Sequence, residues 1–223
     1  MDLQLSDRVV LVVGGSGYIG SAIVDRARAE GATVVAASRS ESADLQLDAS
    51  DDESVDAAIS ALMATHGRVD AVVITAAPSA RTLDPARSSD PAQVAEAIAG
   101  KALTFLRVAN AVIPLMESAG YGRIVGISGQ NAVLTGNVTA AVRNAALNVT
   151  AKNLADAVAG SGVTVNTVNP GTVTESPAAA VEMGRGGESS PTQIADLVAF
   201  LISPLSVLSG ENISIGHRVR GVV

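Results

Sequence analysis

Short apolar runs alternate with helix-like segments along nearly the whole 223-residue chain. The runs are rich in Val and Ile and almost free of polar residues, which is typical of parallel strands covered on both faces. Strands joined by right-handed helical crossovers build a doubly wound parallel sheet. We therefore expect an α/β fold of about seven strands with helices on both faces. The expected strands are 8–13, 33–37, 71–77, 123–128 and 163–168, with weaker candidates at 43–47 and 212–215.

Helical periodicity fills the intervals between these runs. Asp51 and Ser190 precede two of the helical segments as capping residues. The chain length suits one well-buried core, so residues 1–223 are expected to form a single domain. Segment 177–190 has no periodicity and holds three glycines, which indicates a short flexible flap or an ordinary surface connection. The expected helices are 18–30, 52–65, 91–117, 138–159 and 191–202.

Composition excludes several classes of partner. The net charge of −7 argues against nucleic acid and anionic membranes, and two Tyr, two Phe and no Trp leave no base-stacking platform. The absence of Cys rules out disulfides and thiolate metal sites, and two isolated histidines, His66 and His217, make no metal site. No apolar stretch is expected to reach the roughly 18 residues of a membrane span. These features indicate a cytoplasmic protein that binds a small molecule and no metal.

A glycine-rich turn, "VVGGSGYIGSAI" (12–23), lies between the first expected strand and the first helix. Gly14, Gly17 and Gly20 have the G-x-x-G-x-x-G spacing. Such a turn lets backbone N–H groups approach a pyrophosphate, toward which the helix amino terminus presents partial positive charge. The position of the turn in an alternating chain makes the signal strong, and it predicts a Rossmann-type dinucleotide site.

The end of the second expected strand indicates which dinucleotide this site prefers. A carboxylate at this point usually binds the ribose 2′-hydroxyl of NAD. Here the residues are Ser38, Arg39 and Ser40, with no acid before Glu41. A guanidinium can fork onto a 2′-phosphate, so we expect NADP(H) in preference to NAD(H). The alternative is that Arg39 is an ordinary solvated surface residue.

Two further motifs fall in order after the glycine loop: "LDAS" (47–50) after the third strand and "NPG" (169–171) after the sixth. With them the chain resembles the short-chain dehydrogenase/reductase (SDR) family over practically its full length. The resemblance implies an oxidoreductase in which Asp48 binds the adenine amino group, and "TAAP" (75–78) stands at the family's Asn-Ala-Gly. The expected coenzyme-binding residues are Gly14, Ser16, Gly17, Tyr18, Ile19, Gly20, Ser38, Arg39, Ser40, Asp48, Ala49, Thr75, Ala76, Ala77, Pro170, Gly171 and Thr172.

The catalytic residues of the family do not carry over. Aligning the helices places Lys101 at the usual asparagine and Gly129 at the usual serine, with Ser128 just before it. The usual tyrosine falls on Ala140 and the usual lysine on Asn144. The sequence therefore predicts an atypical member that lacks the Asn-Ser-Tyr-Lys tetrad, since alanine has no proton to give.

Lys101 and Asn144 have exchanged residue types relative to the family, where the two positions face each other. An ammonium would then still project into the same volume, and burial would lower its pKa. Lys101 is accordingly a candidate general acid or base, with Ser128 and Asn144 as the other candidate catalytic residues. The alternative is that Lys101 reaches solvent or forms a structural bridge. Arg143 is expected to point away, toward the surface or a subunit interface.

Three functions remain open from the sequence. The first is an NADP(H)-dependent oxidoreductase of atypical mechanism that acts on a small carbonyl or alcohol substrate. The second is an SDR-like enzyme of a non-redox step such as cyclisation, dehydration or isomerisation, and the third is a non-catalytic NADP(H)-binding protein. Helices 91–117 and 138–159 are rich in Ala and Val around more of their circumference than one buried face requires. Together with the family resemblance, this predicts a homodimer or homotetramer.

Overall fold

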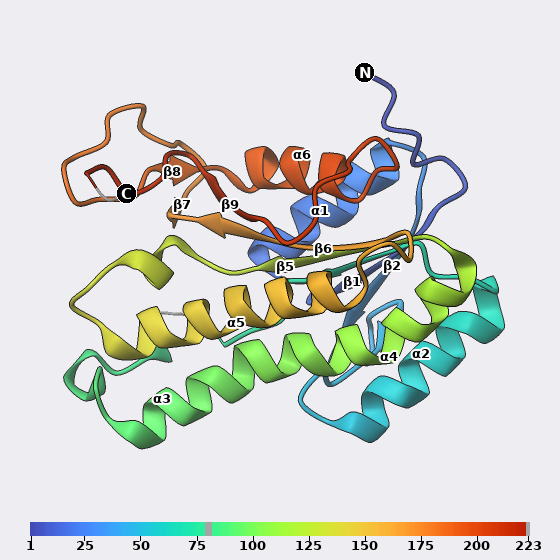
Figure 1. The fold of residues 1–223 in the computed structure, drawn as a ribbon, viewed down its shortest axis with the longest axis horizontal. Coiled ribbons are helices and arrows are strands. Elements are labelled where there is room, and N and C mark those ends of the chain that lie inside the picture. The colour runs from blue at the N-terminus through green and yellow to red at the C-terminus, as the bar shows by residue number, and fades with distance from the viewer. Residues whose placement is uncertain (79–81, 222–223) are drawn as a thin grey trace.

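A computed structural model describes residues 1–78 and 82–221. Its main feature is a seven-stranded sheet in the order β3-β2-β1-β4-β5-β6-β9, with every described pairing parallel (Figure 1). The expected Rossmann-type α/β fold is confirmed. The strands are β1 (Val9–Val13), β2 (Thr33–Ser38), β3 (Leu45–Gln46), β4 (Ala71–Ile74), β5 (Gly122–Ile127), β6 (Val163–Pro170) and β9 (Asn212–Ile215), and β7 (Thr172–Val173) pairs separately with β8 (Glu188–Ser189).

Helices cover both faces of the sheet in three layers (Figure 1). Helices α1 and α6 pack together on one face, and α2, α4 and α5 cover the other, with α3 packed on α5. Capping follows the sequence: the Asp51 carboxylate accepts from the Glu53 N–H, and Ser190 forms a capping box with Gln193. The helices are α1 (Tyr18–Ala29), α2 (Asp52–His66), α3 (Pro91–Ile98), α4 (Thr104–Ala119), α5 (Val138–Ala157) and α6 (Pro191–Leu201).

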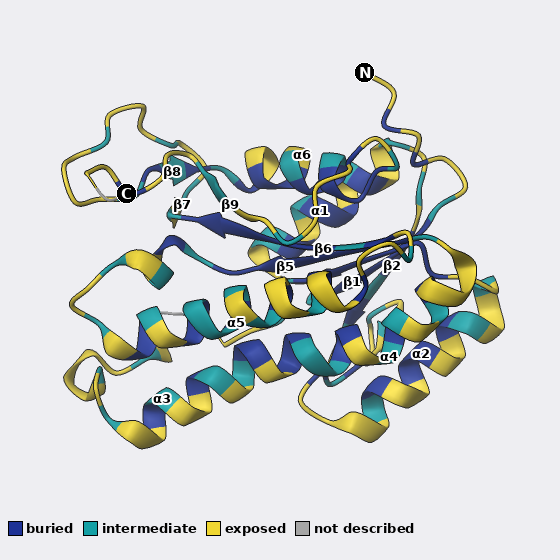
Figure 2. Cartoon of the chain, in the orientation of Figure 1, coloured by how far each residue is buried: buried dark blue, intermediate teal, exposed yellow. Residues whose placement is uncertain are grey.

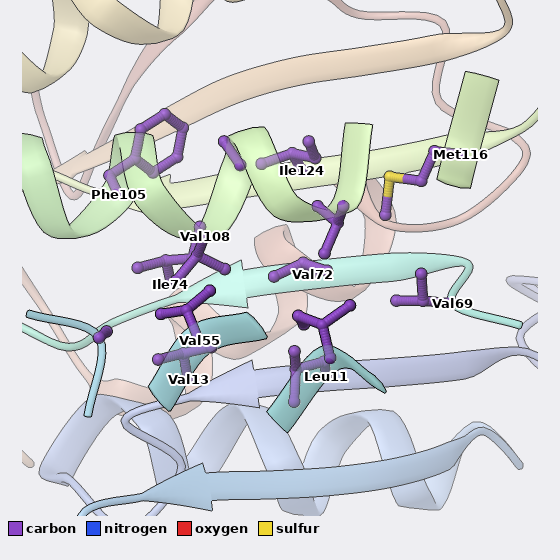
Figure 3. Packing of buried hydrophobic residues seen from close by; sticks show 14 of the residues in the cluster. Leu11, Val13, Val55, Val69, Val72, Ile74, Phe105, Val108, Met116 and Ile124 are labelled. Carbon is purple, nitrogen blue, oxygen red and sulfur yellow. The ribbon is translucent and has the colours of Figure 1, made fainter. Parts of the chain in front are cut away.

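The sheet is buried on both sides, as its apolar runs predict. Alternate side chains of β1 point to opposite faces: Leu11 and Val13 join the core under α2 and α4, and Val10 and Val12 join the core under α1 and α6. Figure 3 shows the first of these cores, where Phe105 and other side chains of α4 pack over the sheet. The central strands β1, β4, β5 and β6 are accordingly the most deeply buried part of the chain (Figure 2).

The expected helix 91–117 is three joined elements. Between α3 and α4 lies η3, a π-helical turn over Ala99–Leu103, in which the Thr104 N–H donates to the Ala99 carbonyl five residues earlier. The run Pro91–Ala119 reaches a mean hydropathy of 1.3 over 18 residues and could cross a membrane by length and composition alone, a test that core helices of soluble proteins also pass. In this fold Val108, Val112 and Met116 of the run are completely buried against the sheet.

The segment expected as a flap lies beside the C-terminal residues (Figure 1). The Gly184 N–H donates to the Arg220 carbonyl, the Arg220 N–H donates to Arg185, and the Gly187 N–H donates to His217, at 2.9–3.1 Å. These backbone hydrogen bonds tie the segment down at three points. The segment can therefore move away only if its hydrogen bonds to residues 217–220 break.

Candidate active site

A cleft of about 900 Å³ opens at the carboxyl ends of β1, β2 and β4. The strand order runs outward in opposite directions from β1 and β4, and ligands of doubly wound sheets bind at such a switch point. The volume suits a small-molecule ligand. The cleft is lined by Val13, Gly14, Ser16, Gly17, Tyr18, Ile19, Gly20, Ser38, Arg39, Ser40, Leu47, Asp48, Ala49, Ser50, Thr75, Ala76, Ala77, Pro78, Thr82, Gly100 and Thr104.

Two glycines of the loop after β1 are required by close packing. Gly14 has φ +86°, and a Cβ there would lie 2.5 Å from the Thr75 hydroxyl oxygen. A Cβ on Gly20 would lie 2.1 Å from the Gly14 carbonyl oxygen. Gly17 differs, because a Cβ there would meet only the Gly14 oxygen, at 3.2 Å, and its φ of −78° suits any residue. The lack of a side chain at Gly17 thus leaves room on the cleft side.

The amino end of α1 faces this cleft without a competing acid. Gly17 is the N-cap residue and supplies no side-chain acceptor, and the first turn holds no Asp or Glu. The helix therefore presents its positive end to whatever occupies the cleft. A bridging pyrophosphate fits this cradle, in which Gly17 carries no side chain on the cleft side.

The far end of the cleft is built by β2 and the loop after β3. Arg39 is exposed and forms no ion pair with any carboxylate of the described residues. The Asp48 carboxylate accepts hydrogen bonds from the Ser50 hydroxyl and N–H on one oxygen, which lowers its pKa, and the Arg39 guanidinium lowers it further. Ser38, Arg39 and Ser40 thus place one cation and two hydroxyls at a point where a 2′-phosphate would fit.

Thr75 holds the floor of the cleft together. Its hydroxyl lies 3.1 Å from the Val13 carbonyl oxygen and 3.0 Å from that of Gly14, so it can bond both across the switch point. The expected strand 71–77 ends at Ile74, and Thr75 and Ala76 continue only with N–H bonds to Val13. The threonine therefore braces β1, β4 and the glycine loop.

Three residues expected to bind coenzyme do not line the cleft: Pro170, Gly171 and Thr172. The loop before β8 lies against them, since the Thr172 N–H donates to the Gly187 carbonyl and a Cβ on Gly171 would lie 2.1 Å from that oxygen. The other expected coenzyme residues all line the cleft.

The candidate catalytic residues come together behind the cleft. Lys101 lies in η3, and its ammonium donates to the Ser128 carbonyl oxygen at 3.0 Å. The Ser128 hydroxyl in turn donates to the Asn144 carbonyl oxygen at 3.1 Å. All three residues are buried, and none of them lines the cleft. Lys101 therefore bridges η3 and the end of β5 through this hydrogen bond.

Lys101 has an unusual electrostatic environment. Burial, together with the nearby positive charge of Arg143, lowers its pKa to about 7. Among the described residues no carboxylate opposes these effects. The lysine is therefore divided between ammonium and amine near neutral pH, which suits a group that donates and accepts a proton. A π-helical turn such as the one that carries Lys101 is frequent at functional sites.

Arg143 corrects the expectation that it points to the surface. It is only 6% exposed, and its guanidinium donates to the Pro78 carbonyl oxygen at 3.2 Å. The buried face of α5 includes Ala140, Arg143, Asn144 and Leu147, spaced three and four residues apart. The helix is buried over a wide arc because α3, η3, the 3-10 turn after β5 and β6 all pack on it. The guanidinium therefore contacts a residue of the cleft wall, Pro78.

The loop after β5 is fixed by two amide side chains. The Gly129 N–H donates to the Asn169 carboxamide oxygen at 3.2 Å, a role that sequence reasoning missed although Asn169 opens the "NPG" motif. Gln130 donates to the carbonyls of Ile215 and His217, while its own oxygen is buried without a hydrogen-bond partner among the described residues. Gln130 is thus engaged with the C-terminal segment.

The parallel sheet, the glycine loop at its switch point and the cleft beside it define a Rossmann-type α/β protein. A profile of the family described as enoyl-(acyl carrier protein) reductase matches residues 16–216. The chain therefore belongs to this family of short-chain dehydrogenases/reductases, an oxidoreductase family, as the sequence resemblance implied.

Similar proteins include enzymes named 3-oxoacyl-[acyl-carrier-protein] reductase FabG. The protein from Vibrio cholerae is 26% identical over 239 residues, covering 96% of this chain and 97% of its own length, and that from Vibrio harveyi is 27% identical over 241 residues with the same coverage. A crystal structure of a protein named gox2181 is 24% identical, with a TM-score of 0.80 over 96% of this chain and 97% of its own. This structural similarity shows the common fold.

Proposed function

We propose that the protein is an NADP(H)-dependent oxidoreductase of a small carbonyl or alcohol substrate, with a non-standard proton donor. The observation that carries the proposal is the arrangement of the cleft: a bare glycine cradle at one end, and a buried lysine with a pKa near 7 behind the other. The first element suits a dinucleotide, and the second suits proton transfer.

The preference for NADP(H) rests on Arg39. Arg39 directly follows the last residue of β2, lies between Ser38 and Ser40 in the chain, and has no carboxylate partner among the described residues. An arginine in this setting binds a phosphate through two parallel hydrogen bonds. Asp48 keeps one carboxylate oxygen away from Ser50 and can accept from the adenine amino group.

Bound NADPH would supply the hydride, and the chain itself would supply the proton. We place that proton on Lys101 Nζ. The four-carbon side chain is held by one hydrogen bond to the Ser128 carbonyl, so a substrate oxygen that replaces this carbonyl as acceptor can receive the proton. The hydrogen bond from the Ser128 hydroxyl to the Asn144 carbonyl fixes Ser128, whose own carbonyl accepts from the ammonium. The absence of tyrosine at Ala140 is consistent with this atypical mechanism.

Turnover tests this function. We expect NADPH oxidation, followed at 340 nm, with at least one member of a panel of small aldehydes, ketones and keto acids. Lys101→Met is expected to lower this turnover about 10²–10⁴-fold, the usual cost of a lost acid. Lys152→Met is the matched control, because Lys152 lies on the exposed side of α5 in an ion pair with Asp156. NADPH binding with no oxidation of NADPH across the panel would contradict the proposal.

A second function is favoured by one observation: Lys101, Ser128 and Asn144 do not line the cleft. A protein that binds NADP(H) without reducing anything would need no such access. Binding without turnover would select this function over the first. A non-redox enzyme would instead convert substrate with no change at 340 nm, which product analysis detects.

We further propose a cytoplasmic, single-domain protein of residues 1–223 that assembles as a homodimer or homotetramer without membrane or nucleic acid. The support for assembly is apolar exposure on the outer side of two helices. Val142 and Val149 of α5 and Leu103 of η3 are 37%, 61% and 40% exposed. Light scattering at several protein concentrations tests it, and a strictly monomeric mass would contradict it.

A further inference from the structure

Two buried cations lie behind the inner wall of the cleft without a balancing acid. Lys101 and Arg143 are each 6% exposed, on η3 and α5, which pack against each other. Among the described residues neither forms an ion pair with Asp or Glu. A buried charge is costly unless it is paired, so an arrangement of two like charges requires compensation.

The oxygen atoms that these cations contact are backbone carbonyls. Lys101 donates to Ser128 at the end of β5, and Arg143 donates to Pro78, four residues beyond the end of β4. These partners use one N–H of each cation and neutralise neither. The Arg143 Nε is buried and has no hydrogen-bond partner among the described residues. The guanidinium thus keeps a buried donor unused.

The two cations share a wall with the cleft. Pro78 and Gly100 both line the cleft, and they touch each other, since a Cβ on Gly100 would lie 2.9 Å from the Pro78 ring. Arg143 holds Pro78 from behind, and Lys101 follows Gly100 in the chain. A group that enters the cleft past the glycine loop therefore meets this wall, with one cation behind each of its two residues.

We infer that the inner end of the cleft, at Pro78 and Gly100, is a carboxylate-binding subsite formed by Arg143 and Lys101, so that the substrate is an acid carrying its carbonyl group near the carboxylate. This inference rests on the proposed function for the carbonyl group. A carboxylate supplies two acceptor oxygens, which match the fork of an arginine and can also accept from an ammonium. A single negative charge suits one permanent cation and one partial cation.

The binding of this anion is coupled to the protonation of Lys101. Arg143 is the charged group that acts on Lys101 from the elements packed against it, and a carboxylate between them would raise the pKa of the ammonium from about 7. Proton uptake therefore accompanies binding, and affinity for the anion falls as the pH rises through 7. A neutral molecule of the same shape gains nothing from either cation.

The test measures binding to the full-length protein without coenzyme. Acetate and the isosteric neutral acetamide are titrated at constant ionic strength against potassium chloride, by thermal shift and by calorimetry. We expect saturable stabilisation by acetate, at least 10-fold weaker binding of acetamide, and a several-fold loss of acetate affinity between pH 6 and pH 8. Equal effects of acetate, acetamide and chloride, or tighter binding of inorganic phosphate than of acetate, would overturn the subsite.

Variants locate the site. Arg143→Gln should weaken acetate at least 10-fold, and Lys101→Met should remove the pH dependence. Arg107→Gln is the matched control, because Arg107 pairs with Asp52 at the surface. If Arg143→Gln does not fold, the inference is still tested by the pH dependence of acetate affinity in the wild-type protein and by its loss in Lys101→Met. Acetate binding that survives both substitutions overturns the inference. NADPH binding and turnover without acetate binding would sink this subsite alone, whereas acetate binding without NADPH binding would sink the proposed function alone.

Discussion

The ammonium of Lys101 lies 3.0 Å from the backbone carbonyl oxygen of Ser128, inside the protein and behind the cleft. Lys101 lies in the π-helical turn Ala99–Leu103. Such a turn holds more residues than a turn of α-helix, so the residues in it and after it face other directions than they would in a continuous α-helix. One hydrogen bond therefore joins the longest helical run of the chain to the end of β5. The proposed proton donor is held there by a partner that a substrate oxygen can replace.

The pH dependence of turnover follows from this environment. Burial and Arg143 lower the pKa of Lys101 to about 7, and reduction of a carbonyl requires the protonated form. We therefore expect carbonyl reduction to fall as the pH rises through about 7, and alcohol oxidation to rise over the same range. Rates of wild-type protein at saturating coenzyme from pH 5.5 to 9 measure this. Parallel pH profiles in the two directions would contradict the assignment.

Arg39 should select the coenzyme. Arg39→Ala removes a charge-assisted contact to a 2′-phosphate, worth roughly 1.5–3 kcal/mol, so NADPH should bind about 10–100-fold more weakly. NADH lacks this phosphate and should change little. Fluorescence titration of both coenzymes measures the difference. Arg28→Ala is the control, since Arg28 lies on α1 in an exposed ion pair with Asp44. An equal loss for NADPH and NADH would refute the role of Arg39.

Two glycines of the same loop should behave differently. Gly20→Ala places a Cβ 2.1 Å from the Gly14 carbonyl, so we expect overpacking to cost about 1–3 kcal/mol of unfolding free energy or more. Gly17→Ala makes one close contact, 3.2 Å from the Gly14 carbonyl oxygen, and should lower the melting temperature much less than Gly20→Ala. It should nevertheless weaken NADPH about 10-fold or more, because the methyl group occupies the cradle. Stable Gly17→Ala protein with wild-type affinity would show that the cradle is not used.

Asp70 should govern stability in acid. Burial raises its pKa, but hydrogen bonds from Arg68, the Val9 N–H and Arg8 lower it more, so the net pKa lies below 3.8. A depressed carboxyl stabilises the folded state above its unfolded pKa, and this stability is lost as the pH falls through the folded value.

Asp70→Asn tests that role. The exchange should cost about 2 kcal/mol at pH 7 and much less near pH 2, measured by urea unfolding, because a neutral amide loses the charge-assisted bonds. Asp44→Asn is the control: its ion pair is half exposed and should contribute less than about 1 kcal/mol. A cost for Asp70→Asn that does not change with pH would contradict this electrostatic explanation.

The sequence predicted the scaffold well because strands buried on two faces consist of continuous apolar runs. Val-rich runs such as Val9–Val13 can be read without tertiary information, and the glycine spacing placed the cleft. The π-helical turn escaped because one extra residue per turn barely changes the periodicity of a 29-residue helical run. Arg143 was placed wrongly because the width of the buried arc of α5 depends on how many elements pack against it, which no single helix encodes.

The candidate site was predicted unevenly for the same reason. Residues of the glycine loop and of β2 act through local backbone geometry, so their positions follow from the motif. Pro170, Gly171 and Thr172 were expected to bind the coenzyme but do not line the cleft, and Gly187 from a distant loop contacts Gly171 and Thr172. Lys101, Ser128 and Asn144 do meet, yet their direction relative to the cleft is set by packing between η3, β5 and α5.

The central claim is that the cleft at the switch point is an NADP(H) site, and direct titration tests it most simply. Purified wild-type protein is titrated with NADPH and with NADH by calorimetry at neutral pH. We predict saturable binding of one NADPH per chain, at least 10-fold tighter than NADH. Absence of binding by either coenzyme, or tighter binding of NADH, would contradict the claim.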